Sequence, residues 1–135
     1  MSDWNQRLID EFRANEGKVG GIFEGRPLLL LHHVGAKTGV QRVSPLMYQA
    51  VDGGYAVFAS KAGADTNPHW FHNLKANPET EIEVETELVA VRARIAGGDE
   101  YDRLWTKQKR DWPHFAEYER KTARERIPVV VLERI

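Results

Sequence analysis

Apolar residues recur with two different periods along the chain, and the helical period predicts four helices. Near the N-terminus, Leu8, Ile9 and Phe12 recur at helical spacing, and Trp4 lies one turn before them. This pattern predicts an N-terminal helix within residues 1–16. Further helices are predicted at about 68–76, at about 100–112 after an N-cap at Asp99, and at 113–124.

Continuous or alternating apolar runs predict the strands. Three consecutive runs are separated by glycine-containing turns, which predicts an antiparallel meander. They cover residues 27–34, 40–51 and 55–61. Residues 80–96 alternate between apolar and polar, which predicts a hairpin with one solvated face. A short strand is also expected at 19–23 and a final buried strand at 127–135.

The order of these elements predicts an α+β fold. About six or seven mostly antiparallel strands alternate with three or four helices, and a sheet of this kind can curl into a closed barrel. We expect a single domain over residues 1–135. The sequence contains neither G-x-G-x-x-G after a strand nor a Walker motif, which argues against a Rossmann or P-loop nucleotide site.

Composition narrows the class of protein. Lys and Arg total 19 against 20 Asp and Glu, so the net charge of -1 predicts no general affinity for nucleic acid. The chain has no cysteine, which excludes disulfides and thiolate sites. No apolar run reaches the roughly 20 residues that span a bilayer. We therefore expect a cytoplasmic protein without an integral membrane segment, with peripheral membrane association as the alternative.

The turn "GAKTG" has the composition of an anion-binding loop. Gly35 and Gly39 tolerate positive φ, so successive backbone N–H groups can point into one concavity. Lys37, Thr38 and Arg42 add two cations and a hydroxyl that suit phosphate or carboxylate. The alternative is an ordinary hairpin turn with solvated charges.

The segment "ASKAGADTNPHW" repeats this composition at the end of another strand. Ser60 and Lys61 precede a small-residue loop with Gly63, and a helix begins just after it. Helix N-termini favour anions. Two basic strand ends in one curled sheet can converge on a single anionic ligand.

The histidines give little support for a metal site. His32 and His33 are neighbours in a strand, so their side chains point to opposite faces. His69 and His72 are three apart on a helix, but the sequence shows no further ligand near them. We expect no metal.

Aromatic residues crowd the C-terminal third of the sequence. Trp105, Trp112, Phe115 and Tyr118 have helical spacing, so core packing explains most of them. The alternative is a wall that packs against a flat ring, with the Tyr118 hydroxyl available to a substrate oxygen. Met47 offers an adaptable floor for such a ring.

Three blocks, "GAKTGVQRVSPL", "FASKAGADTNPHWFHNLKANP" and "RIPVVVLER", resemble the deazaflavin-dependent nitroreductase family over nearly the whole chain. The resemblance implies an actinobacterial split β-barrel, similar to flavin-reductase-like FMN-binding barrels, that binds coenzyme F-420, an 8-hydroxy-5-deazaflavin with an oligoglutamate tail. It also implies hydride transfer from the reduced cofactor to an activated enone, a quinone or a nitroaromatic. Relatives of this compact type are often monomers, so a monomer is expected in preference to a dimer.

The resemblance also implies a role for individual residues. Those matching the cofactor-binding positions are Ala36, Lys37, Thr38, Gly39, Arg42, Pro45, Leu46, Met47, Tyr48, Ala59, Ser60, Lys61 and Asn67. Those matching the substrate pocket are Met47, Trp112, Phe115 and Tyr118. Tyr118 is the expected proton donor, with Ser60 as the alternative. The competing functions are an FMN-binding split-barrel reductase and a deazaflavin carrier without turnover.

Overall fold

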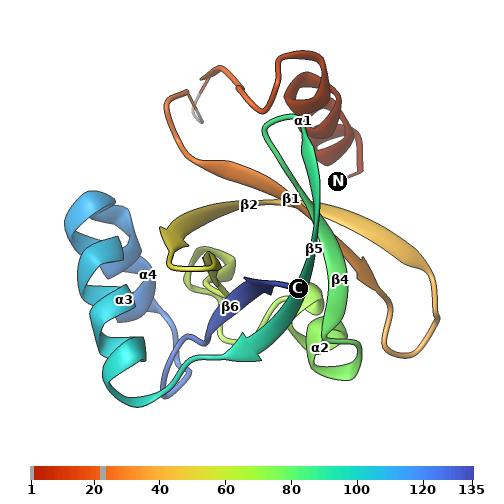
Figure 1. Cartoon of the computed structure of the whole chain (residues 1–135). Helices are drawn as coiled ribbons and strands as arrows, with labels where there is room; N and C mark the ends of the chain where they lie inside the picture. The colour runs from red at the N-terminus through yellow and green to blue at the C-terminus, as the bar shows by residue number, and fades with distance from the viewer. Residues whose placement is uncertain (1, 22–23) are drawn as a thin grey trace.

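The computed structural model describes residues 2–21 and 24–135, with side chains from residue 5 onward. In these residues a six-stranded antiparallel barrel is surrounded by four α-helices (Figure 1). The strands are β1 (Leu28–Val34), β2 (Gln41–Val51), β3 (Gly54–Phe58), β4 (Glu79–Val84), β5 (Glu87–Ile95) and β6 (Val129–Arg134). The helices are α1 (Ser2–Ala14), α2 (His69–Ala76), α3 (Gly98–Asp111) and α4 (His114–Lys121), with the short 3-10 helix η2 (Lys61–Gly63). The α+β barrel predicted from the sequence is confirmed.

Neighbouring strands follow the order β1-β2-β3-β6-β5-β4 around the barrel, and every pair is antiparallel. The predicted meander and hairpin are both present. Two details differ from the prediction. Val19 and Gly20 lie in no strand, because Gly17 and Gly21 on either side have φ of +89° and +65°. Ile22 and Phe23, the rest of that predicted strand, lie outside the described residues, as does the Trp4 side chain.

Helix α3 begins two residues earlier than predicted. Gly97 is its N-cap, in extended conformation, and Asp99 lies in the first turn instead of capping the helix. A carboxylate in the first turn still interacts favourably with the helix dipole.

The strand alternation sorts apolar residues to two sides of the barrel wall. Leu29, Leu31, Val57 and Val91 belong to the inner cluster, and α2 closes one end of the barrel by packing its own apolar residues onto that cluster. Helices α3 and α4 cover the outer face of β3 and β6, and α1 covers the outer face of β1. Figure 1 shows these three helices on the outside and α2 below the barrel in that view.

Strand directions bring the site segments to one end of the barrel. Strands β1, β3 and β5 run the same way, because each is separated from the next by an antiparallel neighbour. The turn after β1, the segment after β3 and the connection after β5 therefore all start at the end that α2 closes. We call this the α2 end.

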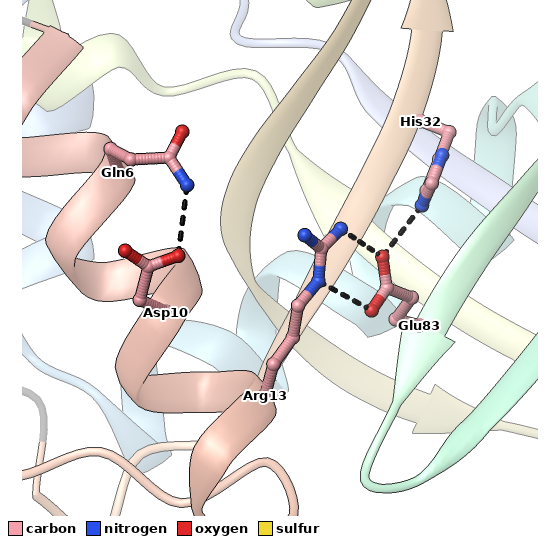
Figure 2. Close-up of polar contacts among 5 residues, drawn as sticks. All are labelled: Gln6, Asp10, Arg13, His32 and Glu83. Carbon is pink, nitrogen blue, oxygen red and sulfur yellow. Dashed lines mark hydrogen bonds and ion pairs between the residues drawn. The ribbon is translucent and has the colours of Figure 1, made fainter.

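A shared carboxylate joins α1 to the barrel. Arg13 of α1 donates two hydrogen bonds to Glu83 of β4, at 2.7 and 3.0 Å, and His32 of β1 lies 2.7 Å from the same carboxylate (Figure 2). Gln6 donates to Asp10 one turn earlier on the helix. The hydrogen bond from Arg13 is the main reason that the pKa of Glu83 lies below its ordinary value. Helix α1 is thus held by an ion pair as well as by its apolar face.

Candidate functional site

The wall of the barrel is incomplete between β2 and β3. Strand β2 pairs with β1 along residues 41–47, but its pairs with β3 cover only residues 48–51. Among the described residues, the first half of β2 therefore has no strand partner on its β3 side. This gap is the split of the barrel, and it lies between the turn after β1 and the segment after β3.

The turn after β1 is a closed loop that exposes its cation. Gly35 and Val40 are joined by a backbone hydrogen bond of 2.9 Å, and Gly39 donates to Gly35. Gly39 has φ of +70°, which glycine adopts without strain. A Cβ at Gly35 would lie 2.4 Å from the Thr38 hydroxyl, so a side chain there would force that hydroxyl to move. Lys37 is exposed at its tip.

A buried polar network fixes this turn. The Ala36 N–H donates to Asn73 Oδ1 of α2 at 2.9 Å, so the Asn73 amide nitrogen faces the His33 ring and donates to Nδ1, also at 2.9 Å. His33 therefore carries its proton on Nε2, which lies 2.9 Å from the Ser44 hydroxyl. Asn73 is 6% exposed and His33 is 4% exposed. Each member of the chain is satisfied, so the network rigidly connects the turn to α2, β1 and β2.

The network requires a neutral His33. Burial is the main cause that lowers the pKa of His33 to about 4, and the positive charge of Arg42 contributes to the same shift. A protonated ring would present a donor to the Asn73 amide donor, which is unfavourable. The His33 side chain points into the barrel and the His32 side chain out of it toward Glu83, as the sequence predicted for adjacent strand residues.

The segment after β3 has an unusual backbone. Lys61 and Ala62 have φ of +48° and +53°, and Gly63 follows at +82°. For residues with a Cβ, this left-handed region costs roughly 1 kcal/mol each, so the surrounding structure must hold it in place. Lys61 is exposed, and its ammonium lies 3.2 Å from the Thr66 hydroxyl. Ser60 is half-buried at the start of the bend.

Arg124 supplies much of that support. Its guanidinium donates to the carbonyl oxygens of Ala59 and Ser60, both at 2.8 Å, and to Asn67 Oδ1 at 2.6 Å. The Asn67 side-chain oxygen is thus occupied by a structural contact. Its amide nitrogen remains a candidate for the predicted cofactor contact.

The cations at the α2 end are not neutralised. Among the described residues, Lys37, Arg42 and Lys61 form no ion pair with a carboxylate, whereas Arg94 elsewhere on the barrel is paired with both Glu100 and Glu133. Exposed cations without a carboxylate are available to a dissolved anion. This donor set fits a ligand with phosphate or carboxylate groups.

The strand β2 splits its predicted ligand contacts between two faces. Met47 packs on the outer clusters beside α1, α3 and α4. Leu46 and Tyr48 pack on the inner cluster, where the Tyr48 ring meets Tyr55 edge-on at 5.2 Å. Pro45 shares the outer face with Met47, because side chains alternate along a strand. The side chains of Leu46 and Tyr48 point inward, so only their backbone atoms lie toward the outer face.

The four predicted pocket residues have two different environments. Phe115 is only 5% exposed and packs between Phe58 and Trp105, with ring centroids 5.9 and 6.2 Å away. Met47, Trp112 and Tyr118 are half-buried at the margin of the same cluster. Phe115 therefore supports the surface that the other three expose.

Two further observations delimit the site. In the described residues, no group of three His, Asp or Glu side chains could hold a metal ion. A cavity of about 300 Å³ between α2 and β5 is lined by residues such as Phe71, Leu74 and Ala93, none of which was predicted as a site residue. The candidate site is therefore the unpaired edge of β2 with the two basic segments beside it, not this cavity.

Sequence reasoning missed three supporting residues. His33 was considered only as a metal ligand, and neither Asn73 nor Arg124 was given a role in the site. Asn73 and His33 meet across 40 positions, and Arg124 reaches residues 57 to 65 positions away. Because such pairings depend on barrel closure, local composition carries no signal for them.

Comparison with known proteins identifies the relatives of the chain. The family model described as "F420H(2)-dependent quinone reductase" matches residues 4–134. The Mycobacterium tuberculosis protein described as "F420H(2)-dependent quinone reductase Rv1261c" is 40% identical over 133 residues, which covers 95% of this chain and 89% of that protein.

Solved structures agree with this relationship. One described as "F420-H2 Dependent Reductase (FDR-A)" is 38% identical, has a TM-score of 0.71, and covers 80% of this chain and 95% of its own. Another, described as a domain-swapped dimer, is 35% identical with a TM-score of 0.73 and 98% coverage of both chains. The haem storage protein HutZ from Vibrio cholerae, at 18% identity and a TM-score of 0.61, shares the fold alone.

Proposed function

Because the chain belongs to the family of F420H(2)-dependent quinone reductases, we propose that it is an oxidoreductase that transfers a hydride from reduced coenzyme F-420 to a planar apolar acceptor such as a quinone. The observation that carries this proposal is the set of unneutralised cations at the α2 end beside a half-buried aromatic surface. The cations suit the acidic tail of the cofactor, and the aromatic surface suits its flat ring and a flat acceptor.

The binding residues lie in the two segments beside the unpaired edge of β2. Lys37 and Arg42 of the first turn and Lys61 of the second segment attract the phosphate and carboxylates of the cofactor. The backbone of Pro45 to Met47 borders the ring along the unpaired edge of β2, and Tyr48 follows where the pairing with β3 begins. When bound, the reduced deazaflavin supplies the hydride, and the protein contributes position and electrostatics.

The acceptor residues lie at the margin of the outer aromatic cluster. Met47 and Trp112 exclude water from an acceptor that lies against them. Tyr118 belongs to the same surface, and among the described residues its hydroxyl has no hydrogen-bond partner. We assign Tyr118 to donate a hydrogen bond, and then a proton, to the oxygen that becomes negative on reduction. Ser60 is the second candidate for this donor.

A titration followed by a turnover assay tests the proposal. Quenching of cofactor fluorescence should show saturable binding of coenzyme F-420, and oxidation of the reduced form should accelerate with menadione. Binding of FMN without coenzyme F-420 would instead identify a flavin enzyme. Binding of coenzyme F-420 without turnover on quinones, enones and nitroaromatics would identify a carrier.

The setting of the reaction is also part of the proposal. None of the helices in the described part of the chain has the length and apolar character needed to cross a bilayer. We propose that a single domain acts in the cytoplasm as a monomer. Because one structural relative is described as a domain-swapped dimer, light scattering at several concentrations is the direct measurement of this state.

A further inference from the structure

Arg124 occupies a position unlike that of the other arginines with described contacts. All but one of its guanidinium N–H groups are engaged, and every acceptor is neutral: the carbonyl oxygens of Ala59 and Ser60, Asn67 Oδ1 and the Thr122 hydroxyl. No described carboxylate is within ion-pair distance of it. Its pKa is lowered by burial. The residue therefore holds a positive charge beside the segment that follows β3, and the Asp65 carboxylate of that segment acts on it electrostatically without forming an ion pair.

The residues just before Arg124 attach the same segment to α4. The Thr122 hydroxyl donates to the Ala64 carbonyl at 2.7 Å, and the Ala123 N–H donates to Asp65 at 2.8 Å. Thr122 in turn follows the last residue of α4, and its N–H donates to the Tyr118 carbonyl at 3.1 Å. The contacts of Thr122, Ala123 and Arg124 with the segment, which we call the clamp, are thus connected directly to the helix that carries Tyr118.

The contact between the segment and α4 is also close. A Cβ on Gly63 would lie 3.1 Å from the Cα and the carbonyl oxygen of Tyr118 and from Cβ of Lys121. Gly63 has φ of +82°, so both space and backbone conformation favour glycine. Because the two backbones are in contact, a shift of the segment moves α4 as well.

We propose that Arg124 is a positioning residue that locks the cofactor-binding segment 59–67 to α4, and so fixes the Tyr118 side chain relative to the bound ring. This inference rests on the proposed function. A small displacement of a catalytic group is costly in rate, so the clamp affects turnover more than it affects binding.

The fork of the guanidinium is essential to this role. Its planar N–H groups reach two carbonyl oxygens and an amide oxygen at once, whereas a lysine ammonium is a point charge on a flexible chain. A lysine at position 124 preserves the positive charge under the segment but not its geometry. Arg124→Lys and Arg124→Met therefore separate the charge from the positioning.

Arg126 is the matched control. It stacks on the Tyr101 ring, with the guanidinium carbon 4.0 Å from the centroid, and has no described contact with residues 59–67. Arg126→Met changes the net charge of the chain by the same amount as Arg124→Met. A difference in Kd or kcat between these two variants therefore reflects where the charge lies and not the net charge of the chain.

The experiment measures cofactor Kd by fluorescence quenching at low and high salt, kcat and KM with menadione, and thermal unfolding. We expect Arg124→Lys to lower kcat about tenfold while Kd changes less than about threefold. Arg124→Met should lower kcat similarly and raise Kd about tenfold at low salt, with a smaller increase at high salt. Arg126→Met should leave Kd and kcat close to those of the wild type. Wild-type kcat in Arg124→Lys would overturn the proposal.

Hydrogen exchange on the protein without cofactor keeps this inference separate from the proposed function. Arg124→Met should speed the exchange of amides in residues 60–64, and Arg126→Met should not. Thr122→Val removes one contact of the clamp and should give a smaller increase if Arg124→Met fails to fold. Unchanged exchange in segment 59–67 in Thr122→Val and in every folded Arg124 variant would sink the positioning role. If wild-type protein binds no coenzyme F-420, the proposed function fails even where the exchange result holds.

Discussion

His33 should make the stability of the α2 end depend on pH. It is 4% exposed and accepts a hydrogen bond from Asn73, and burial lowers its pKa to about 4. The unfolded chain holds this proton with an ordinary pKa near 6.5 and so binds it more readily than the folded protein does. The contribution of His33 to the free energy of unfolding is therefore fully present above about pH 6.5 and is lost as the pH falls toward 4.

The size of the effect follows from the two pKa values. A shift of one unit corresponds to about 1.4 kcal/mol, so the full shift of His33 corresponds to about 3 kcal/mol. Because the unfolded chain takes up this proton first, the free energy of unfolding falls by about 2 kcal/mol between about pH 7 and pH 5. A domain of ordinary stability, roughly 5–15 kcal/mol, would lose a substantial share of its margin through this one residue.

Urea unfolding at several pH values tests this reasoning with two variants. His33→Gln should be less stable than wild type near neutral pH, but should lose about 2 kcal/mol less between about pH 7 and pH 5, because its amide does not titrate. His72→Gln, on the exposed face of α2, should follow the wild-type curve. Carboxylates titrate equally in all three proteins, so the differences isolate His33. Parallel curves for wild type and His33→Gln would refute the buried neutral ring.

Three further substitutions test other parts of the molecule. Lys37→Ala should weaken binding of coenzyme F-420 by roughly 1–3 kcal/mol in a fluorescence titration, while Lys18→Ala, in the loop before β1, should not; equal losses would remove the anion-binding role of the turn. Tyr118→Phe should lower kcat with menadione at nearly unchanged cofactor affinity, and unaltered turnover would place the donor elsewhere. Glu83→Gln should lower the unfolding free energy by about 1 kcal/mol, because Arg13 loses its charged partner (Figure 2). For Glu83, whose pKa is lowered in the folded state, the same contribution in wild type is present at neutral pH and lost as acid protonates the carboxylate.

The barrel could be predicted from the sequence because its signals are local. The apolar runs of β1 and β3 and the alternation of β4 and β5 reflect burial on both faces or on one face of the wall. The glycine-rich turns are equally local. The strand expected at residues 19–23 shows the limit of this reasoning, since the φ values at Gly17 and Gly21 outweighed the apolar pattern.

The candidate site was harder to predict because side-chain direction depends on three-dimensional packing. Helical spacing placed Phe115 and Tyr118 on one face, but only the packing of α4 on Phe58 and Trp105 decides that the first is buried and the second half-exposed. The gap between β2 and β3 depends on register, which no single segment specifies.

The two anion-binding segments share a construction that explains why the site needs the closed barrel. Each is a tight bend that exposes a cation, and each is held by one polar side chain from a distant segment: Asn73 for Ala36, and Arg124 for Ser60. The supports come from different elements, since Asn73 lies on the helix that closes the barrel and Arg124 on the connection from α4 to β6. Neither bend is held in place before the barrel closes. The backbone of both bends is therefore fixed by the fold, and the ligand does not have to order it when it binds.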